Sequence, residues 1–493
     1  MLFHHPRILT AFGLVLASSL AQAEGDTKEA AIRQELRAIA NGPVIADWQK
    51  QVGATTQPPS AHEFKVDAQG DGQTLCTDKI QKAIDDCSAA GGGIVDFAPG
   101  SYVTGSLFVK SNVHLRIDKA VTLLGSTNDD DWPKIHTRAA GIETEWRAAL
   151  INMRDQQNVS ITGEGTLDAR GRHFWQEFFD ALADYSKRGL RWAVDYDISR
   201  PHLLQVYQSR DVTIQGLTLL NSPFWTVHVV FSKNVTVDHI TIQNNLEGKG
   251  PSTDGINIDS SAFCVVSNCD VDNNDDNYSF KSGINADGLR VNLPVQYTVF
   301  HDNISRRGHG LMTLGSDMSG GIHHVEAYNL EAFGTAVGIR FKSARVRGGD
   351  VSDIYIHDVK LHGVGKAILA DLNWFPSFSY PKIPDTEKII PPVWKILSAP
   401  NPKGTPLPHF HDIILANIEA TKSGGGLSIE GLPNSPLENV TLRNIKMQTD
   451  KAGSISNAKN WTFTDVIISG KDGKPMTVKD SENVSPPSRK NSP

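Results

Sequence analysis

The chain has 493 residues, of which 39% are hydrophobic and 21% are charged, and its formal net charge is -7. This composition is ordinary for a folded protein. The acidic balance argues against a nucleic-acid-binding protein, because such proteins usually carry a basic excess. Its 42 glycines, together with Asn and Asp, cluster at the ends of short apolar runs, which indicates many tight turns between short strands.

The first 23 residues resemble an export signal. Arg7 precedes an apolar run from Ile8 to Leu20, and Ala21-Gln22-Ala23 follows it. A basic end, a short apolar stretch and an A-x-A site are typical of a secretory signal peptide, with cleavage expected after Ala23. The run is too short to span a membrane. We therefore expect a secreted or periplasmic protein.

An oxidising compartment gives the four cysteines a chance to form disulfides. Cys76 and Cys87 flank a helical stretch and are candidates for a pair. Cys264 and Cys269 lie five residues apart, too far for a bridge along a straight strand, although a turn between them would bring them close. The sequence leaves that second pairing open.

The segment after the signal predicts a cap at one end of a repeat fold. Residues 24–65 are expected to form a helix and a linker rich in Pro and Gln. A 3.6-residue pattern predicts a second helix over 77–90, with Thr77 as its N-cap and Gly91-Gly92-Gly93 ending it. A repeat fold needs such a cover over its open end.

A unit of two short alternating runs, separated by a break and ended by Asn or Gly, recurs from there at spacings from the low twenties upward. That length fits one turn of a parallel β-helix, and the Val, Ile and Thr content suits strands stacked inside it. We therefore predict an all-β, single-stranded right-handed parallel β-helix over residues 66–473 and a disordered polar tail over 474–493. The units begin at Asn158, Asp211, Asn234, Phe263, Gln296, Gly321, Val351, His411, Glu438 and Asn460.

Two aromatic insertions interrupt the repeat, over about residues 172–199 and 365–408. Long loops on a rigid solenoid often carry binding residues, but they can equally pack as an apolar satellite against the stack. The sequence leaves both possibilities open. Their aromatic residues are Phe174, Trp175, Phe178, Phe179, Tyr185, Trp192 and Tyr196 in the first, and Trp374, Phe375, Phe378, Tyr380 and Trp394 in the second.

Four polar motifs lie at spacings compatible with one column on the side of such a helix. Asp254 and Asp275 are 21 residues apart, about one turn, and residues one turn apart stack on the same wall. Arg340 and Lys342 are two apart, so both point away from the core if Phe341 points into it. The motifs are Ser252-Thr253-Asp254-Gly255, Asn274-Asp275-Asp276-Asn277, Gly308-His309-Gly310 and Arg340-Phe341-Lys342.

This set of side chains suits glycoside hydrolysis. One carboxylic acid protonates the leaving oxygen, and another carboxylate activates water or attacks carbon. Carboxylates placed close together raise one another's proton affinity, so one can stay protonated while another stays ionised. Adjacent Asp275 and Asp276 can serve one site only at a turn or bulge, which their Asn-rich surroundings permit.

The four motifs resemble the signature of family 28 glycoside hydrolases, the polygalacturonase family, whose pattern is Asn-Thr-Asp, Gly-Asp-Asp, Gly-His-Gly and Arg-Ile-Lys. The resemblance implies that Asp275 is the general acid and that Asp254 and Asp276 activate water for inverting hydrolysis. It further implies that His309 supports the acid and that Arg340 and Lys342 grip the galacturonate carboxylate, with no metal and no cofactor. Ser252, Asn274, Asn277 and Phe341 depart from the family pattern but remove no carboxylate or cation.

The stretches that begin at Gly308 and Arg345 resemble the bacterial exo-acting members of this family. Exo action needs one end of the substrate cleft to be closed, and the two insertions could do this. We expect a pectic polysaccharide or oligogalacturonide substrate, no nucleic-acid or membrane partner, and a monomer. The alternatives are a rhamnogalacturonan or xylogalacturonan hydrolase of the same family, a pectate lyase, and a β-helix that binds carbohydrate without cleaving it.

Overall fold

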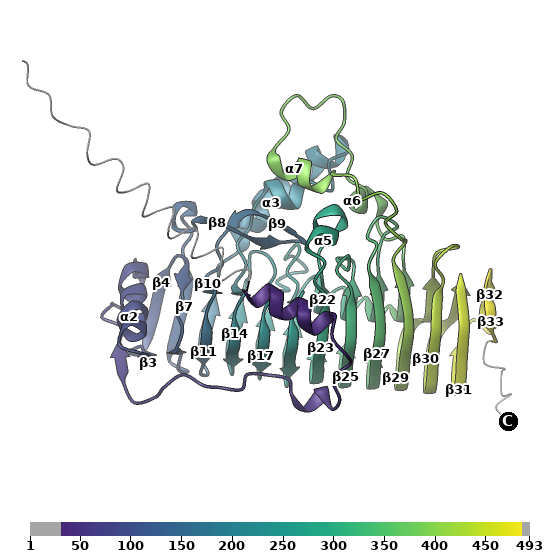
Figure 1. Cartoon of the computed structure of the whole chain (residues 1–493), viewed down its shortest axis with the longest axis horizontal. Helices are drawn as coiled ribbons and strands as arrows, with labels where there is room; N and C mark the ends of the chain where they lie inside the picture. Colours follow the sequence, from purple (N-terminus) through teal and green to yellow (C-terminus); the bar gives the residue numbers. More distant parts are fainter. Residues whose placement is uncertain (1–30, 486–493) are drawn as a thin grey trace, which may run out of the picture.

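The computed structural model describes residues 31–485 and forms one long solenoid of parallel strands (Figure 1). Each strand pairs with the strand one turn further along the chain, so the sheets grow along the axis of the solenoid. This confirms the predicted parallel β-helix. Among the described residues, no helix is both long enough and apolar enough to cross a membrane.

Three stacks of strands make up the solenoid. The one that matters for the site, here called the first wall, pairs consecutively from β10 to β28. Its strands are β10 (Ile151–Arg154), β13 (Leu204–Tyr207), β16 (Val227–Val230), β19 (Ile256–Asp259), β22 (Asp276–Lys281), β24 (Gly310–Gly315), β26 (Val337–Lys342) and β28 (Lys366–Asp371).

The second stack contains all ten units predicted from the sequence. From β23 onward its strands lengthen and absorb the short third stack, since β23 pairs with both β20 and β21. The second stack is β11 (Gln157–Thr162), β14 (Arg210–Gln215), β17 (Lys233–Asp238), β20 (Ala262–Ser267), β23 (Val295–Ser305), β25 (Ile322–Phe333), β27 (Asp350–His362), β29 (His409–Glu430), β30 (Leu437–Ser456) and β31 (Ala458–Gly470). The third is β12 (Thr166–Asp168), β15 (Thr218–Leu220), β18 (Thr241–Gln243) and β21 (Asp270–Asp272).

The core follows from the two-residue period of these strands. Every second side chain points inward and meets its counterpart one turn away, as Ile258 meets Phe280 and Leu314 meets Phe341. These residues are almost fully buried. The intervening side chains of the first wall point outward, and they are the ones available for chemistry.

Asparagines in the left-handed backbone region make several of the bends. Asn439, Asn460 and Asn483 have φ of 53°, 55° and 53°, which Asn tolerates better than most residues. The amide nitrogen of Asn460 donates to Asn439 Oδ1 at 3.4 Å, and that of Asn483 donates to Asn460 Oδ1 at 2.9 Å. These three Asn residues therefore form a ladder along the last rungs of the solenoid.

Helix α2 (Thr77–Ala89) covers one end of the solenoid, as predicted (Figure 1). Its Ile80, Ile84 and Cys87 are buried against the early strands β1 (Glu63–Lys65), β2 (Asp71–Leu75), β3 (Gly93–Asp96), β4 (Gly100–Thr104), β5 (Leu107–Phe108), β6 (Val113–Arg116) and β7 (Val121–Gly125). The predicted Thr77 N-cap is wrong, because the helix begins at Thr77 itself. The Thr77 hydroxyl instead accepts a hydrogen bond from the Gly105 backbone N–H at 2.8 Å.

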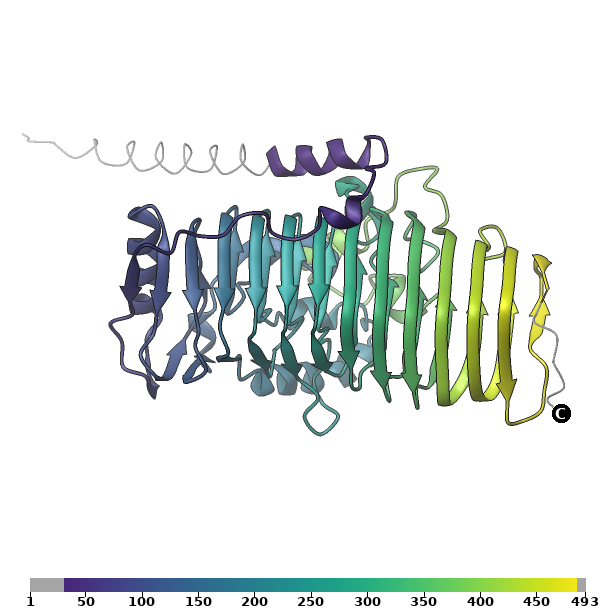
Figure 2. The same cartoon turned by 90° about the horizontal axis from the view of Figure 1, so that it is seen from below.

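The segment before β1 lies against the outside of the second stack (Figure 2). It contains a helix over 31–40 and the short 3-10 helix η1 (Trp48–Lys50). A helix and a linker were predicted for this segment. Trp48 meets Tyr297 edge-on at 5.7 Å, which fixes the segment to β23. The predicted signal peptide lies outside the described residues.

The far end extends beyond the predicted boundary at residue 474. Strands β32 (Thr477–Lys479) and β33 (Glu482–Val484) pair with β30 and β31. The prediction of a disordered tail over 474–493 is therefore wrong up to Val484, because polar residues can still form a last rung when the preceding rung offers free backbone groups. Residues 486–493 lie outside the described part.

All four cysteines are buried free thiols, so the candidate pair Cys76–Cys87 does not form. The Cys76 thiol points instead at the carbonyl oxygen of Thr74, 3.1 Å away. Cys264 lies on β20 and Cys269 lies in the bend that follows this strand, and both are buried in the core. The strand keeps them apart, as the geometry of a straight strand requires.

The two insertions project together from the solenoid (Figure 1). The first holds α3 (Arg172–Lys187) and α4 (Val194–Asp197), and the second holds α6 (Pro376–Ser379) and α7 (Pro392–Leu397). The second begins later than predicted, because residues 366–371 form β28. Beside them lie a two-stranded sheet, β8 (Lys134–Ala139) and β9 (Ile142–Arg147), the 3-10 helix η2 (Asp129–Asp131) and α5 (Asn285–Val291).

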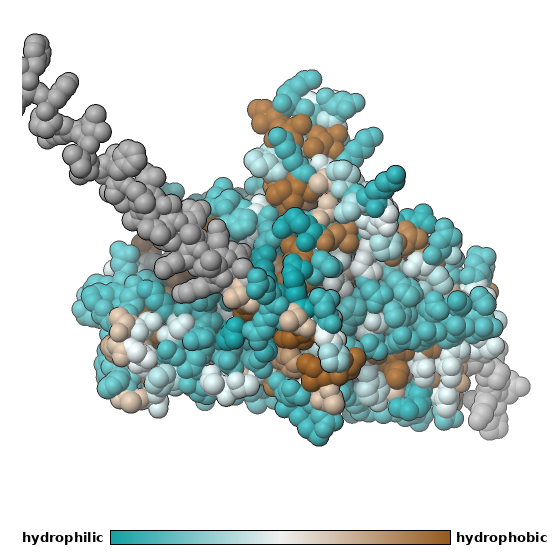
Figure 3. Space-filling model, viewed as in Figure 1, coloured by the Kyte–Doolittle hydropathy of each residue, from teal (hydrophilic) through white to brown (hydrophobic). Residues whose placement is uncertain are grey.

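The insertions pack against each other through aromatic side chains. Trp192 and Trp394 meet edge-on at 5.5 Å, and Arg188 forms two hydrogen bonds with Glu387, at 3.0 and 2.7 Å. Figure 3 shows apolar side chains at the tip of this projection. Ile389 and Ile390 of the second insertion are exposed. The apolar packing predicted as one alternative is therefore present.

Candidate active site

A cavity of about 400 Å³ lies between the first wall and the two insertions. It is lined by every sequence-predicted site residue: Asp254, Asp275, Asp276, His309, Arg340 and Lys342. Its other side is formed by Arg191 of the first insertion and by Trp374, Phe375 and Phe378 of the second. The insertions therefore contribute to a site as well as packing on each other.

Strand register explains how the aspartates meet. Ile256 of β19 lies opposite Tyr278 of β22, an offset of 22 residues. Continuing this register places Asp254 opposite Asp276, whereas a spacing of 21 residues would have matched it with Asp275. In the same way Asp276 lies opposite Gly310, which places Asp275 beside His309.

A turn lets adjacent Asp275 and Asp276 face one cavity. The backbone N–H of Asp275 donates to Asn273 Oδ1 at 3.1 Å, and that of Asp276 donates to Asp275 Oδ1 at 2.9 Å. These bonds hold the chain out of the alternating strand pattern just before β22 begins. One oxygen from each of Asp254, Asp275 and Asp276 lies within 4.8 Å of the other two.

Gly308 allows the next turn to approach this bend. Its φ of 105° lies in the region that favours glycine, and a Cβ there would lie 2.4 Å from the Asp275 carbonyl oxygen. The close approach lets the His309 backbone N–H donate to that oxygen at 2.9 Å. The His309 ring then lies with Nδ1 3.2 Å from Asp275 Oδ1.

Cations surround Asp276. Lys342 Nζ donates to its Oδ2 at 3.0 Å, Thr313 Oγ1 donates to its Oδ1 at 2.9 Å, and Arg340 lies 3.6 Å away. Lys281 Nζ lies 3.8 Å from Asp276 and 3.4 Å from Asp254. Asp276 therefore has three positive partners in a nearly dry environment.

Lys281 was not predicted from the sequence. It faces the same way as Lys342, because Lys281 follows Phe280 opposite Leu314 and Lys342 pairs with Gly315. Two-residue alternation from the buried Tyr278 and Phe280 would have placed it on the outward face. Its charge also lies 5.4 Å from the Trp225 ring.

The three carboxylates differ in proton affinity for identifiable reasons. Burial raises the pKa of Asp254 to about 8, and the charges of Asp275 and Asp276 add to that effect while Lys281 opposes it. Burial acts on Asp276 too, but Lys342, Lys281 and Arg340 outweigh it and hold its pKa far below the usual range. In the free protein Asp254 is therefore protonated near neutral pH, and Asp276 is ionised.

Asp275 and His309 form a charge pair. Burial raises the proton affinity of Asp275, yet the charge and hydrogen bond of His309 prevail and lower its pKa. Reciprocally, Asp275 raises the pKa of His309 to about 9. The two side chains thus share one transferable proton, which is bound to the imidazole of His309 in the free protein.

A buried network supports the floor of the cavity. Arg200 donates to Asp195 at 2.6 Å, and Ser252 donates to the same oxygen at 2.9 Å. Asp195 comes from the first insertion, so this network ties that insertion to the turn that carries Asp254. Ser252 takes up this role at a position where the predicted signature has Asn.

Closely grouped carboxylates of opposed protonation, on the wall of a parallel β-helix, suit the acid–base cleavage of a glycosidic bond. Comparison with known proteins gives the family. Residues 97–386 match the model of Glycosyl hydrolases family 28, and the chain belongs to that family. Family membership excludes the pectate-lyase alternative.

Relatives and solved structures agree with this assignment. A "Probable polygalacturonase" of Vitis vinifera is 30% identical over 408 residues, 80% of this chain and 75% of the relative. An "Exo-poly-alpha-D-galacturonosidase" of Dickeya chrysanthemi is 28% identical over 374 residues, 68% of this chain and 61% of the relative. The crystal structure of an exopolygalacturonase from Thermotoga maritima superposes with a TM-score of 0.70 at 26% identity, covering 89% of this chain and 96% of that one.

Proposed function

We propose that this protein is an exo-acting polygalacturonase that releases sugars from the ends of galacturonan chains with inversion at the anomeric carbon. The observation that carries the proposal is the group of three aspartates in a cavity walled by two insertions, of which Asp254 is buried and protonated and Asp276 is buried and ionised. The names of the relatives in Dickeya chrysanthemi and Thermotoga maritima support the substrate. As an enzyme acting on plant polymers, it is expected to work outside the cytoplasm.

Asp275 acts as the general acid. Its Oδ1 shares a proton with His309 Nδ1 across 3.2 Å. When substrate fills the cavity and excludes water, the separated charges of this pair become less favourable, and the proton moves to the carboxylate. Asp275 then gives the proton to the glycosidic oxygen as the bond from that oxygen to the anomeric carbon breaks.

Asp276 acts as the base. Its three cationic neighbours keep it ionised, so it can take a proton from a water molecule whose oxygen attacks the anomeric carbon. Asp254 lies on the same side and, being protonated, orients that water by hydrogen bonding. The proton that Asp276 accepts from water balances the one that Asp275 donates to the leaving oxygen.

Arg340 is the group best placed to bind the carboxylate of galacturonate. Its Nε is buried and has no hydrogen-bond partner within the described part of the chain. Lys342 is already bonded to Asp276 and lies 4.2 Å from the Trp374 ring, so it contributes mainly positive potential. A guanidinium suits a carboxylate because it offers parallel donors.

The stereochemical outcome needs its own test. Two carboxyl groups that act with inversion usually stand about 6.5–9.5 Å apart, to leave room for water. The nearest oxygens here lie within 4.8 Å. The proposal of inversion rests on the third carboxylate, which allows water to be held by Asp254 and Asp276 together while Asp275 serves as acid.

The first experiment follows the products formed from polygalacturonate and from rhamnogalacturonan. Chromatography should show only mono- or digalacturonate from polygalacturonate in the first minutes, with the β-anomer appearing first in proton NMR. A ladder of oligomers from the start would contradict exo action. Initial α-anomer would contradict inversion, and turnover of rhamnogalacturonan alone would favour the other family activity.

A further inference from the structure

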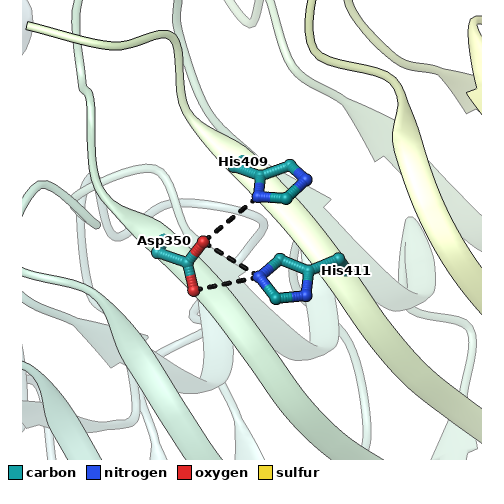
Figure 4. Close-up of side chains that lie close together, drawn as sticks. All are labelled: Asp350, His409 and His411. Atoms are coloured by element: carbon teal, nitrogen blue, oxygen red, sulfur yellow. Dashed lines mark hydrogen bonds and ion pairs between the residues drawn. The ribbon is translucent and has the colours of Figure 1, made fainter.

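A second cluster of chemistry-bearing side chains lies outside the active site, at the foot of the second insertion. Asp350 is the first residue of β27, and His409 and His411 are on β29, directly after the insertion returns to the solenoid. Asp350 lies opposite His409 in the strand register. His411 is two residues further and points the same way, so all three side chains converge (Figure 4).

The converging atoms are those that bind metal ions. Asp350 Oδ1 lies 3.3 Å from His409 Nδ1 and 3.0 Å from His411 Nε2, and one ligand atom from each residue lies within 4.8 Å of the other two. Ligands at about 2.0–2.1 Å from a tetrahedral zinc ion stand roughly 3.4 Å apart. The observed separations already approach that value without movement of the backbone.

Each of the three side chains also has a polar partner outside the cluster. Ser352 Oγ donates to Asp350 Oδ2 at 3.0 Å, and Asp412 Oδ2 lies 2.7 Å from His411 Nδ1. Glu438 lies 3.7 Å from His409 Nε2. Such outer partners orient metal-bound imidazoles and carboxylates and increase their basicity.

The side chains are accessible to an incoming ion. His411 is 22% exposed, His409 39% and Asp350 41%. A site with three protein ligands leaves a fourth position for water.

We propose that Asp350, His409 and His411 bind one divalent transition-metal ion, with Zn²⁺ the best fit to two imidazoles and a carboxylate. The ion joins β27 to the first residues of β29 and so fixes the returning end of the insertion that walls the catalytic cavity. It takes no part in hydrolysis, because these residues are not among those lining that cavity.

The test is zinc binding by purified, tag-free protein that has been treated with chelator and dialysed. Calorimetric titration with ZnCl₂ should give one equivalent, and Co²⁺ should give the intense visible bands of a tetrahedral site. His409→Ala and His411→Ala should each weaken zinc binding at least tenfold. Asp412→Asn should weaken it about 10–100-fold, the usual effect of an outer carboxylate.

Two controls separate this site from others. His357 also contacts the Asp that follows it, at 2.6 Å, but among the described residues it belongs to no group of metal-binding side chains, so His357→Ala should bind zinc as wild type does. Asp275→Asn should also bind one equivalent, which excludes the catalytic aspartates as the zinc site. Wild type without zinc uptake, or His409→Ala and His411→Ala with unchanged uptake, would overturn the proposal and leave an ordinary ion-pair cluster.

Discussion

The pairing of Asp275 with His309 decides where the catalytic proton lies. His309 has its pKa raised to about 9 by Asp275, and Asp254 has its pKa raised to about 8 by burial. His309 carries its positive charge only below about pH 9, and Asp254 stays neutral only below about pH 8. Activity should therefore be lost as pH rises through about 8 to 9, since the site then has no proton to deliver.

His309→Ala tests this directly. Without the imidazole, Asp275 loses its proton donor, so kcat should fall by roughly 10²-fold, within the range of general acid catalysis. KM should change little, and the alkaline limb should move to lower pH. His301→Ala, at an imidazole paired with Asp302 away from the cavity, is the control. An unchanged alkaline limb in His309→Ala would contradict the proposed proton path.

Lys281 is expected to set the position of the acidic limb of the pH–rate profile. Asp276 must be ionised, and its pKa is held low partly by Lys281, 3.8 Å away. Lys281→Met should raise that pKa, so activity should be lost at a higher pH as the solution is acidified. Kinetics from acid to neutral pH measure the shift, with Lys366→Met on β28 as control. If the acid limb stays in place, Lys281 does not tune the base.

The two insertions act as one element. Trp394 is buried, meets Trp192 at 5.5 Å and donates to Asp197 at about 3 Å, so it holds the second insertion against the first. Removing a buried Trp commonly costs about 3–5 kcal/mol. Trp394→Ala should therefore loosen the cavity wall more than it destabilises the solenoid.

Longer oligomers among the early products, and faster hydrogen exchange over residues 376–397, are the expected results for Trp394→Ala. Ile389→Ala changes a side chain on the same insertion that is 84% exposed, and it should leave both measurements unchanged. A product profile like that of wild type in Trp394→Ala would show that the insertion does not determine exo action.

The elements also show what sequence could and could not predict. Strands with a two-residue period, such as β14 and β17, were predictable because burial on one face leaves a direct signal. The pairing of Asp254 with Asp276 was not, because a rung of 22 residues in place of 21 depends on the bend at Asn273. The contact between the insertions joins residues nearly 200 positions apart, as Arg188 to Glu387, and local patterns carry no information on it.

At the scale of the whole molecule, the covered end keeps a repeat fold from pairing with other chains. Helix α2 supplies that cover with Ile80 and Ile84, both completely buried. Ile84→Ala should cost about 2–5 kcal/mol, lower the Tm and promote self-association. Light scattering after size-exclusion chromatography tests this, with Asp86→Ala on the exposed face as control. A monomer with unchanged Tm would contradict the capping role.

The most direct test of the central claim is the release of reducing sugar from polygalacturonate, with chelator present, by wild type and by Asp275→Asn. The substitution keeps the shape of the side chain and removes the transferable proton. The account predicts metal-independent turnover by wild type and a loss of about 10²–10⁴-fold in the variant, the size of a general acid contribution. Comparable rates for the two proteins, or no release by either, would contradict it.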